Sequence, residues 1–304
     1  MPLVRGHIWN FMHFLVPGGL AYALSGNAVI GFAVTLACGV ITLFIADRVA
    51  KPWQDFFGLE GTTCSTFSLI AFTYPISWLI NLIIDHVPGL NKVDFSLDKI
   101  PSQLSFLGNP EMIGLIAGLF LSLMTFQPIP NILTVCIGMS AVMLLIPRMV
   151  AIMMEGLTSL GNAANTYTKS KLGEDAEIYI GMDIALGLGD PTCITATAIM
   201  IPIVIGLSFL IPDMRFFPLG ILAEVCYIAP MAAMTSRGNL LRTLLCMSAV
   251  FFIAMWLMSI NADFCTQFLN ICNVDFAGTA VTASHFGWNP GALIVCGVAK
   301  VFGL

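Results

Sequence analysis

Charged residues are scarce in this chain. Asp, Glu, Lys and Arg make up 10% of its 304 residues, whereas about 25% is usual in soluble domains. The net charge of −5 is spread along the sequence, and no basic run or basic patch interleaved with aromatic residues occurs. The low charge excludes an ordinary soluble domain, and no pattern suggests a nucleic-acid partner, so we expect none.

The sequence also lacks the short motifs of enzymes and metal sites. It contains no Walker motif, no G-x-G-x-x-G after a predicted strand, no H-E-x-x-H and no Cys/His cluster with metal-ligand spacing. We therefore expect no cofactor, no metal and no autonomous enzyme, so any phosphoryl chemistry needs a donor carried by a partner. The nine cysteines lie mostly in apolar segments and are predicted to be small core residues. Cys265 and Cys272 could form a disulfide in an oxidising compartment, but nothing in the sequence requires one.

Long uncharged stretches take the place of charge. A helix needs about 20 apolar residues to cross a bilayer, and five stretches without Asp, Glu, Lys or Arg reach or exceed that length: residues 6–46, 61–84, 112–147, 191–212 and 243–262. They predict an all-α polytopic membrane protein with seven to nine membrane-embedded segments. We expect a single membrane-embedded domain over residues 1–304, with residues 85–109 and 165–180 as extramembrane loops.

Local patterns predict where these segments break. Ser25-Gly26 separates the first two, and the run from Gln127 to Asn131, with prolines at 128 and 130, divides residues 112–147 into two short segments. Residues 47–57 mix charged and aromatic residues, which predicts an interfacial amphipathic helix with Trp53 at headgroup level. Residues 148–171 predict another surface helix, which ends in a polar hairpin over residues 169–177.

Two aspartates, Asp183 and Asp190, lie at predicted membrane depth. A carboxylate there costs about 2.5–3.5 kcal/mol on insertion scales. Glycines at 181, 187 and 189 and a proline at 191 surround the pair, so a continuous helix is unfavourable. Broken backbone survives in a membrane only inside protein or beside a water-filled cavity. The pattern indicates a polar site in a transport protein.

Each aspartate has a functional and a structural interpretation. As a ligand, its carboxylate can accept hydrogen bonds from the hydroxyl groups of a substrate, or act as a base toward one of them. As a structural residue, it caps a broken helix, and Asp190-Pro191-Thr192 fits an N-cap followed by proline at the first helical position. The two roles can coexist.

Further candidate substrate ligands are Glu60, Thr63, Thr66, His13 and Gln127. Glu60 precedes a hydroxyl-rich patch at residues 62–66, which is typical of a re-entrant tip or a cavity lining. The alternatives are structural: Glu60 is a rim carboxylate, the threonines satisfy local backbone groups, and His13 is a hydrogen-bonded core residue. Gln127 and Asn131 lie at the proline-rich break.

Six segments of the chain occur in the same order, with similar spacing, in one known family. They are Ile8-Trp9-Asn10 with His13; Phe57-Gly58-Leu59-Glu60-Gly61; Ile84 with Val87-Pro88-Gly89-Leu90-Asn91-Lys92; Ala141-Val142-Met143-Leu144-Leu145-Ile146-Pro147-Arg148; Gly181-Met182-Asp183 with Leu188-Gly189-Asp190-Pro191; and Arg237-Gly238-Asn239-Leu240-Leu241-Arg242-Thr243. The chain thereby resembles the membrane-spanning IIC component of the galactitol-type sugar phosphotransferase system.

The resemblance implies a multi-pass permease of the bacterial plasma (inner) membrane. Such a permease binds a sugar alcohol or related sugar and passes it inward, where a IIB partner, itself supplied by IIA, phosphorylates it. The implied fold has two inverted repeats, a substrate site near the midplane among broken helices, and a scaffold that forms a homodimer. This chain matches only part of that pattern: it lacks about the first quarter of the family pattern and its extreme end. We therefore expect a fragment, a misassigned start, or half of a split permease whose N-terminal part is separately encoded.

Two questions stay open at this stage. Composition and broken helices fit equally well a proton- or sodium-coupled secondary transporter, in which Asp183, Asp190 or Glu224 binds the ion. The segment at residues 62–66 departs from the proline-containing version that relatives often carry, so the resemblance fixes neither the local turn nor the details of substrate contact there. The basic turn with Arg237 and Arg242 is expected to face the cytoplasm.

Overall fold

The computed structural model describes residues 8–89, 93, 109–173, 179–274 and 287–303. Within these ranges helices dominate, and five are long and apolar enough to cross a membrane by length and composition: Ala28–Phe57, Leu69–His86, Ile129–Val150, Pro191–Ser208 and Leu240–Ile260. The predicted all-α membrane class is confirmed. Most of the predicted loop at residues 85–109 lies outside the described residues.

The chain begins with a short 3-10 helix, η1 (Ile8–Phe11), and a helical pair, α1 (Met12–Ser25) and α2 (Ala28–Phe57). The predicted break is confirmed: Gly26 ends α1 with a φ of 65°, and the Asn27 side chain caps α2 by accepting from the Val29 amide. A Cβ on Gly18 would lie 2.7 Å from the Gly31 carbonyl oxygen. The two helices therefore pack backbone against backbone.

Helix α2 corrects one prediction. Residues 47–57 are not a separate interfacial helix but the last part of this 30-residue helix. The Trp53 side chain is fully buried, and its indole nitrogen donates to the Thr62 hydroxyl at 3.1 Å. The headgroup position predicted for Trp53 is wrong, because the strand that follows α2 folds back over this face and supplies both apolar contact and an indole acceptor.

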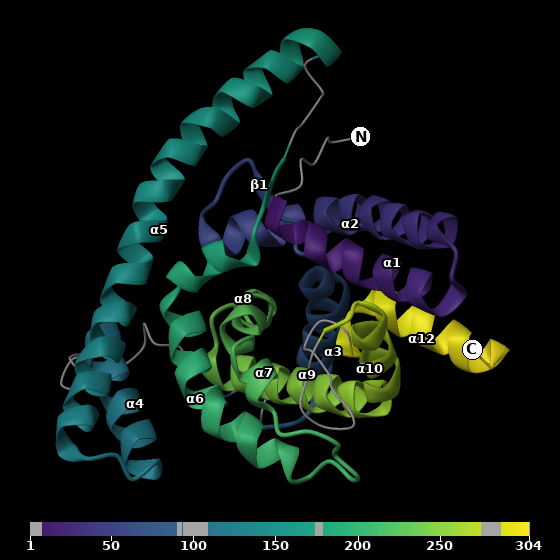
Figure 1. The fold of residues 1–304 in the computed structure, drawn as a ribbon. Helices are drawn as coiled ribbons and strands as arrows, with labels where there is room; N and C mark the ends of the chain where they lie inside the picture. The colour runs from purple at the N-terminus through teal and green to yellow at the C-terminus, as the bar shows by residue number, and fades with distance from the viewer. Residues whose placement is uncertain (1–7, 90–92, 94–108, 174–178, 275–286, 304) are drawn as a thin grey trace.

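Helices α4 (Pro110–Met124) and α5 (Ile129–Leu172) form a hairpin, and the predicted break between Gln127 and Asn131 is confirmed. Helix α5 runs without interruption for 44 residues, so the surface helix predicted at residues 148–171 is its continuation. Its last turns also occupy the start of the loop predicted at residues 165–180. Figure 1 shows α5 as a long bowed rod along one side of a rounded body.

Two three-residue strands join distant parts of the chain. Strand β1 (Thr62–Cys64) pairs in parallel with β2 (Ile180–Met182), with Thr63 opposite Gly181. Strand β1 leads through a π-helical turn, η2 (Leu69–Thr73), into α3 (Tyr74–His86), and β2 leads through a 3-10 helix, η6 (Ile184–Gly189), into α6 (Pro191–Ser208). Each strand thus leads into a candidate membrane span: β1 into Leu69–His86, which begins with the π-helical turn, and β2 through η6 into α6.

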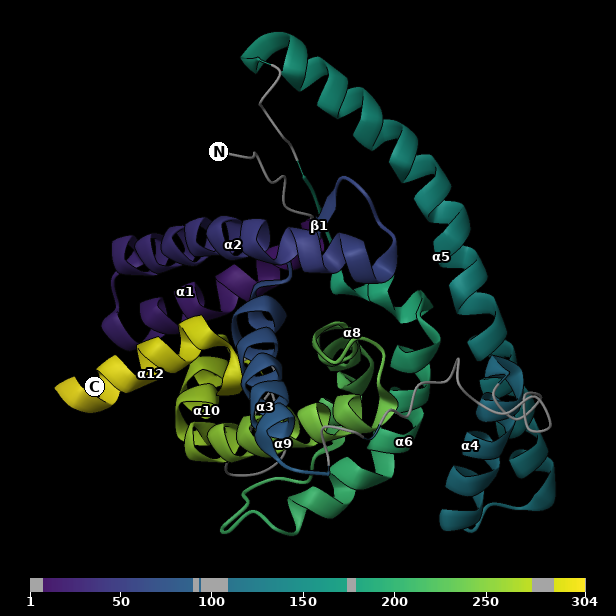
Figure 2. The same cartoon turned by 180° about the vertical axis from the view of Figure 1, so that it is seen from behind.

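The remaining helices complete the core. They are α7 (Leu219–Leu222), α8 (Val225–Thr235), α9 (Leu240–Ile260), α10 (Ala262–Ile271) and α12 (Pro290–Phe302). Helix α8 is buried almost all round, and it contacts α3, α6, α9 and both irregular turns. Figures 1 and 2 show it near the centre of the rounded body. Short buried helices of this kind need protein on every side, and α8 supports both irregular turns, η2 and η6, by packing against them.

Candidate functional site

Both predicted aspartates lie on the segment between β2 and α6. Asp183 directly follows β2 and caps η6, since its Oδ1 accepts from the Ala185 amide at 2.8 Å. Asp190 ends η6 and caps α6, where its Oδ1 accepts from the amides of Thr192 at 2.9 Å and Cys193 at 3.1 Å. Both side chains are half-buried. The capping interpretation therefore describes the geometry of both residues. A substrate would have to bond the carboxylate lone pairs that the caps do not use.

The turn between the aspartates packs tightly on its neighbours. A Cβ on Gly187 would lie 2.5 Å from Pro230 Cβ on α8 and 3.0 Å from Phe57 Cζ at the end of α2. Real Cβ atoms do not approach a proline ring that closely. Glycine at 187 thus lets η6 pack directly on α8, and this close contact helps to position the two aspartates at the ends of η6.

A third acidic residue belongs to the same neighbourhood. Glu224 is buried at the N-terminus of α8. The charges of Asp183 and Glu224 both act on the Tyr227 phenol, which is part of α8, and the charge of Asp183 also reaches Cys64 on β1. The site therefore combines acidic groups with a phenolic hydroxyl, a set of groups that can hydrogen-bond a neutral, hydroxyl-rich molecule.

The hydroxyl-rich patch lies beside this turn, but its two threonines that were predicted as ligands are hydrogen-bonded to backbone groups. Thr63 is fully buried and donates to the Ala46 carbonyl on α2 at 2.6 Å. Thr66 is also buried, and its hydroxyl accepts from the Ile184 amide at 3.1 Å. In this conformation both threonines bond backbone groups, but these lie 17 and 118 residues away and are not the local groups that the structural interpretation expected. Direct contact between these two residues and a substrate stays a prediction.

His13 belongs to a buried network at the same level of the fold. Its Nδ1 lies 2.8 Å from the Ser68 hydroxyl, and the Asn289 amide donates both to that hydroxyl and to the His13 carbonyl, each at 2.9 Å. The histidine side chain is 3% exposed. The geometry is that of a hydrogen-bonded core histidine, and a substrate contact at His13 likewise stays a prediction.

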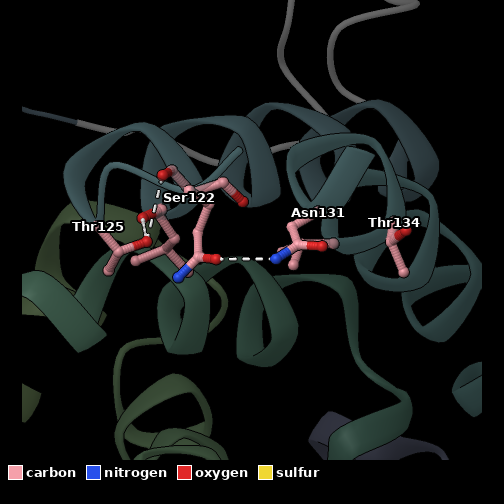
Figure 3. A pocket seen from close by; sticks show the side chains of 7 residues that line it. Ser122, Thr125, Asn131 and Thr134 are labelled. Atoms are coloured by element: carbon pink, nitrogen blue, oxygen red, sulfur yellow. Dashed lines mark hydrogen bonds between the residues drawn. The ribbon is translucent and has the colours of Figure 1, made fainter. Parts of the chain in front are cut away.

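Glu60 and Gln127 both lie in exposed turns. Glu60 is exposed in the turn between α2 and β1. Gln127 is exposed in the turn of the α4–α5 hairpin, where the Asn131 amide donates to it at 3.1 Å. Gln127 and Asn131 line an open depression of about 350 Å³ (Figure 3), whose other lining residues are Leu121, Ser122, Thr125, Thr134 and Val135. Figures 1 and 2 place this turn at the end of the hairpin remote from β1, so the structure does not bring Gln127 to Asp183.

Sequence reasoning gave no role to two buried amides, Asn10 and Asn289. Asn289 precedes Pro290 and caps α12, by accepting from the Gly291 and Ala292 amides, so an Asn-Pro cap signal was present. Asn10 carried no such signal, because its partners are 55 and 56 residues away. In the described part of the chain, no group of three His, Cys, Asp or Glu residues is arranged to hold a metal ion.

Comparison with known proteins gives a consistent result. Residues 3–280 match the family described as "PTS system sugar-specific permease component". The chain is 30% identical over 288 residues to the "PTS system galactitol-specific EIIC component" of Escherichia coli strain K12, which covers 95% of this chain and 63% of that protein. The protein of the same name from Escherichia coli O157:H7 matches to the same extent. The chain thus spans about 63% of the length of these relatives. No solved structure matches it.

Proposed function

Because this chain belongs to the family of sugar-specific permease components of the phosphotransferase system, whose members are membrane transport subunits, we propose that it binds a sugar alcohol or related sugar and moves it inward across a bacterial plasma membrane. The relatives named for galactitol suggest a galactitol-like substrate. The substrate is then phosphorylated by a IIB partner that is recharged by IIA. A homodimer in the lipid bilayer is part of the same proposal.

The observation that carries the proposal is the acidic break between β2 and α6. Asp183 and Asp190 lie on an irregular segment that interrupts the path into a membrane-length helix, and irregular backbone at membrane depth marks a protein-lined site. A carboxylate accepts hydrogen bonds from two hydroxyls of one polyol, and these bonds strengthen where water is excluded. We assign substrate contact first to Asp183, because capping uses only its Oδ1 and that bond involves the single amide of Ala185.

Phosphoryl transfer in this scheme is the work of the partner. The phosphoryl group leaves the sulfur of the IIB phosphocysteine and bonds to a substrate hydroxyl oxygen, that hydroxyl loses its proton, and the cysteine is left as a thiolate. This chain positions the hydroxyl. A carboxylate close to it, such as Asp183, can take up the proton.

The test measures transport in membrane vesicles that carry the chain. With phosphoenolpyruvate and the soluble phosphotransferase proteins inside, we expect radiolabelled galactitol to accumulate as its phosphate. Asp183→Asn is expected to raise the KM at least about tenfold, because a hydrogen bond to a charged group is worth about 1.5–3 kcal/mol. The matched control is Asp263→Asn, which removes a carboxylate of an exposed ion pair and leaves KM unchanged. Uptake that is driven by a proton or sodium gradient without phosphoenolpyruvate would instead establish a secondary transporter.

A further inference from the structure

The two peptide groups on either side of Asp183 are held by hydroxyl side chains. The Met182 carbonyl, before Asp183, accepts from the Ser65 amide at 2.9 Å and from the Ser65 hydroxyl at 3.2 Å. The Ile184 amide, after Asp183, donates to the Thr66 hydroxyl at 3.1 Å. Ser65 and Thr66 therefore fix the backbone from which the Asp183 side chain projects.

A single buried amide ties these two hydroxyls together. The Asn10 Nδ2 donates to the Ser65 hydroxyl at 2.9 Å, and the Thr66 hydroxyl donates to the Asn10 Oδ1 at 3.2 Å. With the bonds to Met182 and Ile184, these contacts close a ring that passes through the backbone of Asp183. We name this ring, formed by Asn10, Ser65, Thr66 and the two peptide groups, the Asp183 clamp.

The direction of every bond in the clamp is consistent. The Ile184 amide donates to Thr66, Thr66 donates to the Asn10 oxygen, the Asn10 nitrogen donates to Ser65, and Ser65 donates to the Met182 carbonyl. Each hydroxyl accepts once and donates once, as a hydroxyl with one proton can. Asn10, Ser65 and Thr66 are each 1% exposed. Buried networks that are fully satisfied rigidify their surroundings.

From this arrangement we infer that Asn10 is a positioning residue, which sets the carboxylate of Asp183 for substrate through the Asp183 clamp. The inference depends on the proposed substrate contact at Asp183. Asn10 itself does not contact substrate in this scheme, because it is 1% exposed and its side chain is bonded to Ser65 and Thr66. Its removal leaves the Thr66 hydroxyl as a buried donor without its acceptor, so Thr66 and then Ile184 must shift to find another.

The first experiment is a double-mutant cycle on the binding of radiolabelled galactitol to the purified chain. Asn10→Ala is expected to raise Kd about tenfold in the otherwise unchanged protein, since small misplacements of a ligand group are costly. In the Asp183→Asn background the same change is expected to raise Kd less than about twofold, because residues that act through one another are not additive. Equal effects in both backgrounds overturn the inference.

The matched control is another buried asparagine in the core. Asn81 on α3 donates to the Ser77 carbonyl and to the Ser236 hydroxyl, but it lies outside the Asp183 clamp. Asn81→Ala is expected to lower Tm as much as Asn10→Ala while its effect on galactitol binding is the same with and without Asp183. Thr66→Val is expected to reproduce the loss seen in Asn10→Ala, and the conservative variant Thr66→Ser, which keeps the hydroxyl, is expected to recover most of the affinity that Thr66→Val loses.

Hydrogen exchange separates failure of this inference from failure of the proposed function. In Asn10→Ala we expect residues 180–188 to exchange faster, and in Asn81→Ala we expect no change in that segment. If the segment exchanges normally in Asn10→Ala, the clamp does not hold Asp183 and the inference is overturned, whatever the substrate. If exchange rises but Asp183→Asn binds galactitol normally, the substrate contact proposed for Asp183 is overturned.

Discussion

Single residues at the site carry two duties that substitutions can separate. Asp183 and Asp190 both cap a helix and both are candidates for substrate contact. Asparagine retains the side-chain oxygen that a cap needs, and it caps as well as aspartate does. The amide has no charge, however, and charge makes a hydrogen bond from a substrate hydroxyl stronger.

Asp190 is the residue at which this separation is sharpest. Asp190→Ala removes the acceptor for the Thr192 and Cys193 amides and is expected to cost about 1 kcal/mol of stability, while Asp190→Asn melts close to the unchanged protein. If Asp190 also contacts substrate, Asp190→Asn binds galactitol more weakly despite its normal Tm. Thermal melting and equilibrium binding on the same preparations check both statements. A normal Kd for Asp190→Asn limits this residue to capping.

Gly187 is expected to tolerate no side chain. Gly187→Ala drives its Cβ into the Pro230 ring, which cannot rotate away, so η6 must lift from α8 and both Tm and galactitol affinity fall. Overpacking of this kind typically costs about 1–3 kcal/mol. Gly206→Ala on α6 is the control, since nothing lies within 4 Å of its new Cβ. A melting curve for Gly187→Ala that matches the control would contradict the close packing described here.

At the scale of elements, local chemistry predicted the ends of helices better than their continuity. The turn at Ser25-Gly26 and the cap at Asp190-Pro191 were readable because glycine, aspartate and proline act within a few residues. The unbroken path of α2 through Asp47 and Arg48 was not, since the charges suggested a surface helix. What decides it is β1, which covers Trp53 and lies nine residues further along the chain at Thr62.

The connection between α6 and α7 is joined to α10 by an ion pair that gives a pH-dependent prediction. The Arg215 guanidinium donates to Asp263 at 2.7 Å, and this hydrogen bond lowers the pKa of the Asp263 carboxyl below its ordinary value of 3.8. Because the pKa of Asp263 is lower in the folded chain, its ionised carboxylate stabilises the fold at pH values above the ordinary pKa. This contribution is lost as the pH falls through the lowered pKa.

Thermal melting as a function of pH checks the sign of this effect. The chain is expected to melt slightly higher than Asp263→Asn at pH 7, by a small margin because the ion pair is exposed to solvent. The difference should shrink as pH falls below the ordinary pKa of 3.8 and should also shrink in high salt. A difference that grows on acidification would contradict the assignment.

At the scale of the whole molecule, the sequence predicted a polar site in a helical membrane protein but not how that site is assembled. Strands β1 and β2 are three residues each, too short for a period-two pattern to reveal. The Asp183 clamp joins residues 117 and 118 positions apart. Hydroxyl and amide partners at such separations leave no periodic trace, which is why the sequence marks Asn10 only as part of a family segment and does not reveal its role.

The orientation of α9 gives a prediction for the whole fold. Its 21 residues are enough to cross a bilayer, so Arg237 before it and the exposed Cys272 after α10 are expected on opposite sides of the membrane. In intact cells a membrane-impermeant maleimide should label native Cys272, and Arg237→Cys should become reactive only in inside-out vesicles, as basic turns favour the cytoplasm. Labelling of both positions from one side would rule out a crossing by α9.

The Asn289 amide that reaches the His13 carbonyl has a consequence for biosynthesis. This bond spans 276 residues, and the ribosome adds only about 5–20 residues per second. The N-terminal helices must therefore wait, already inserted, with Ser68 and the His13 carbonyl still lacking the amide that α12 will bring. During that interval these two polar groups, which are buried in the folded protein, face either lipid or the insertion machinery. The centre of this protein is closed last, and premature termination before Asn289 should leave a chain that membrane quality control recognises by its open polar interior.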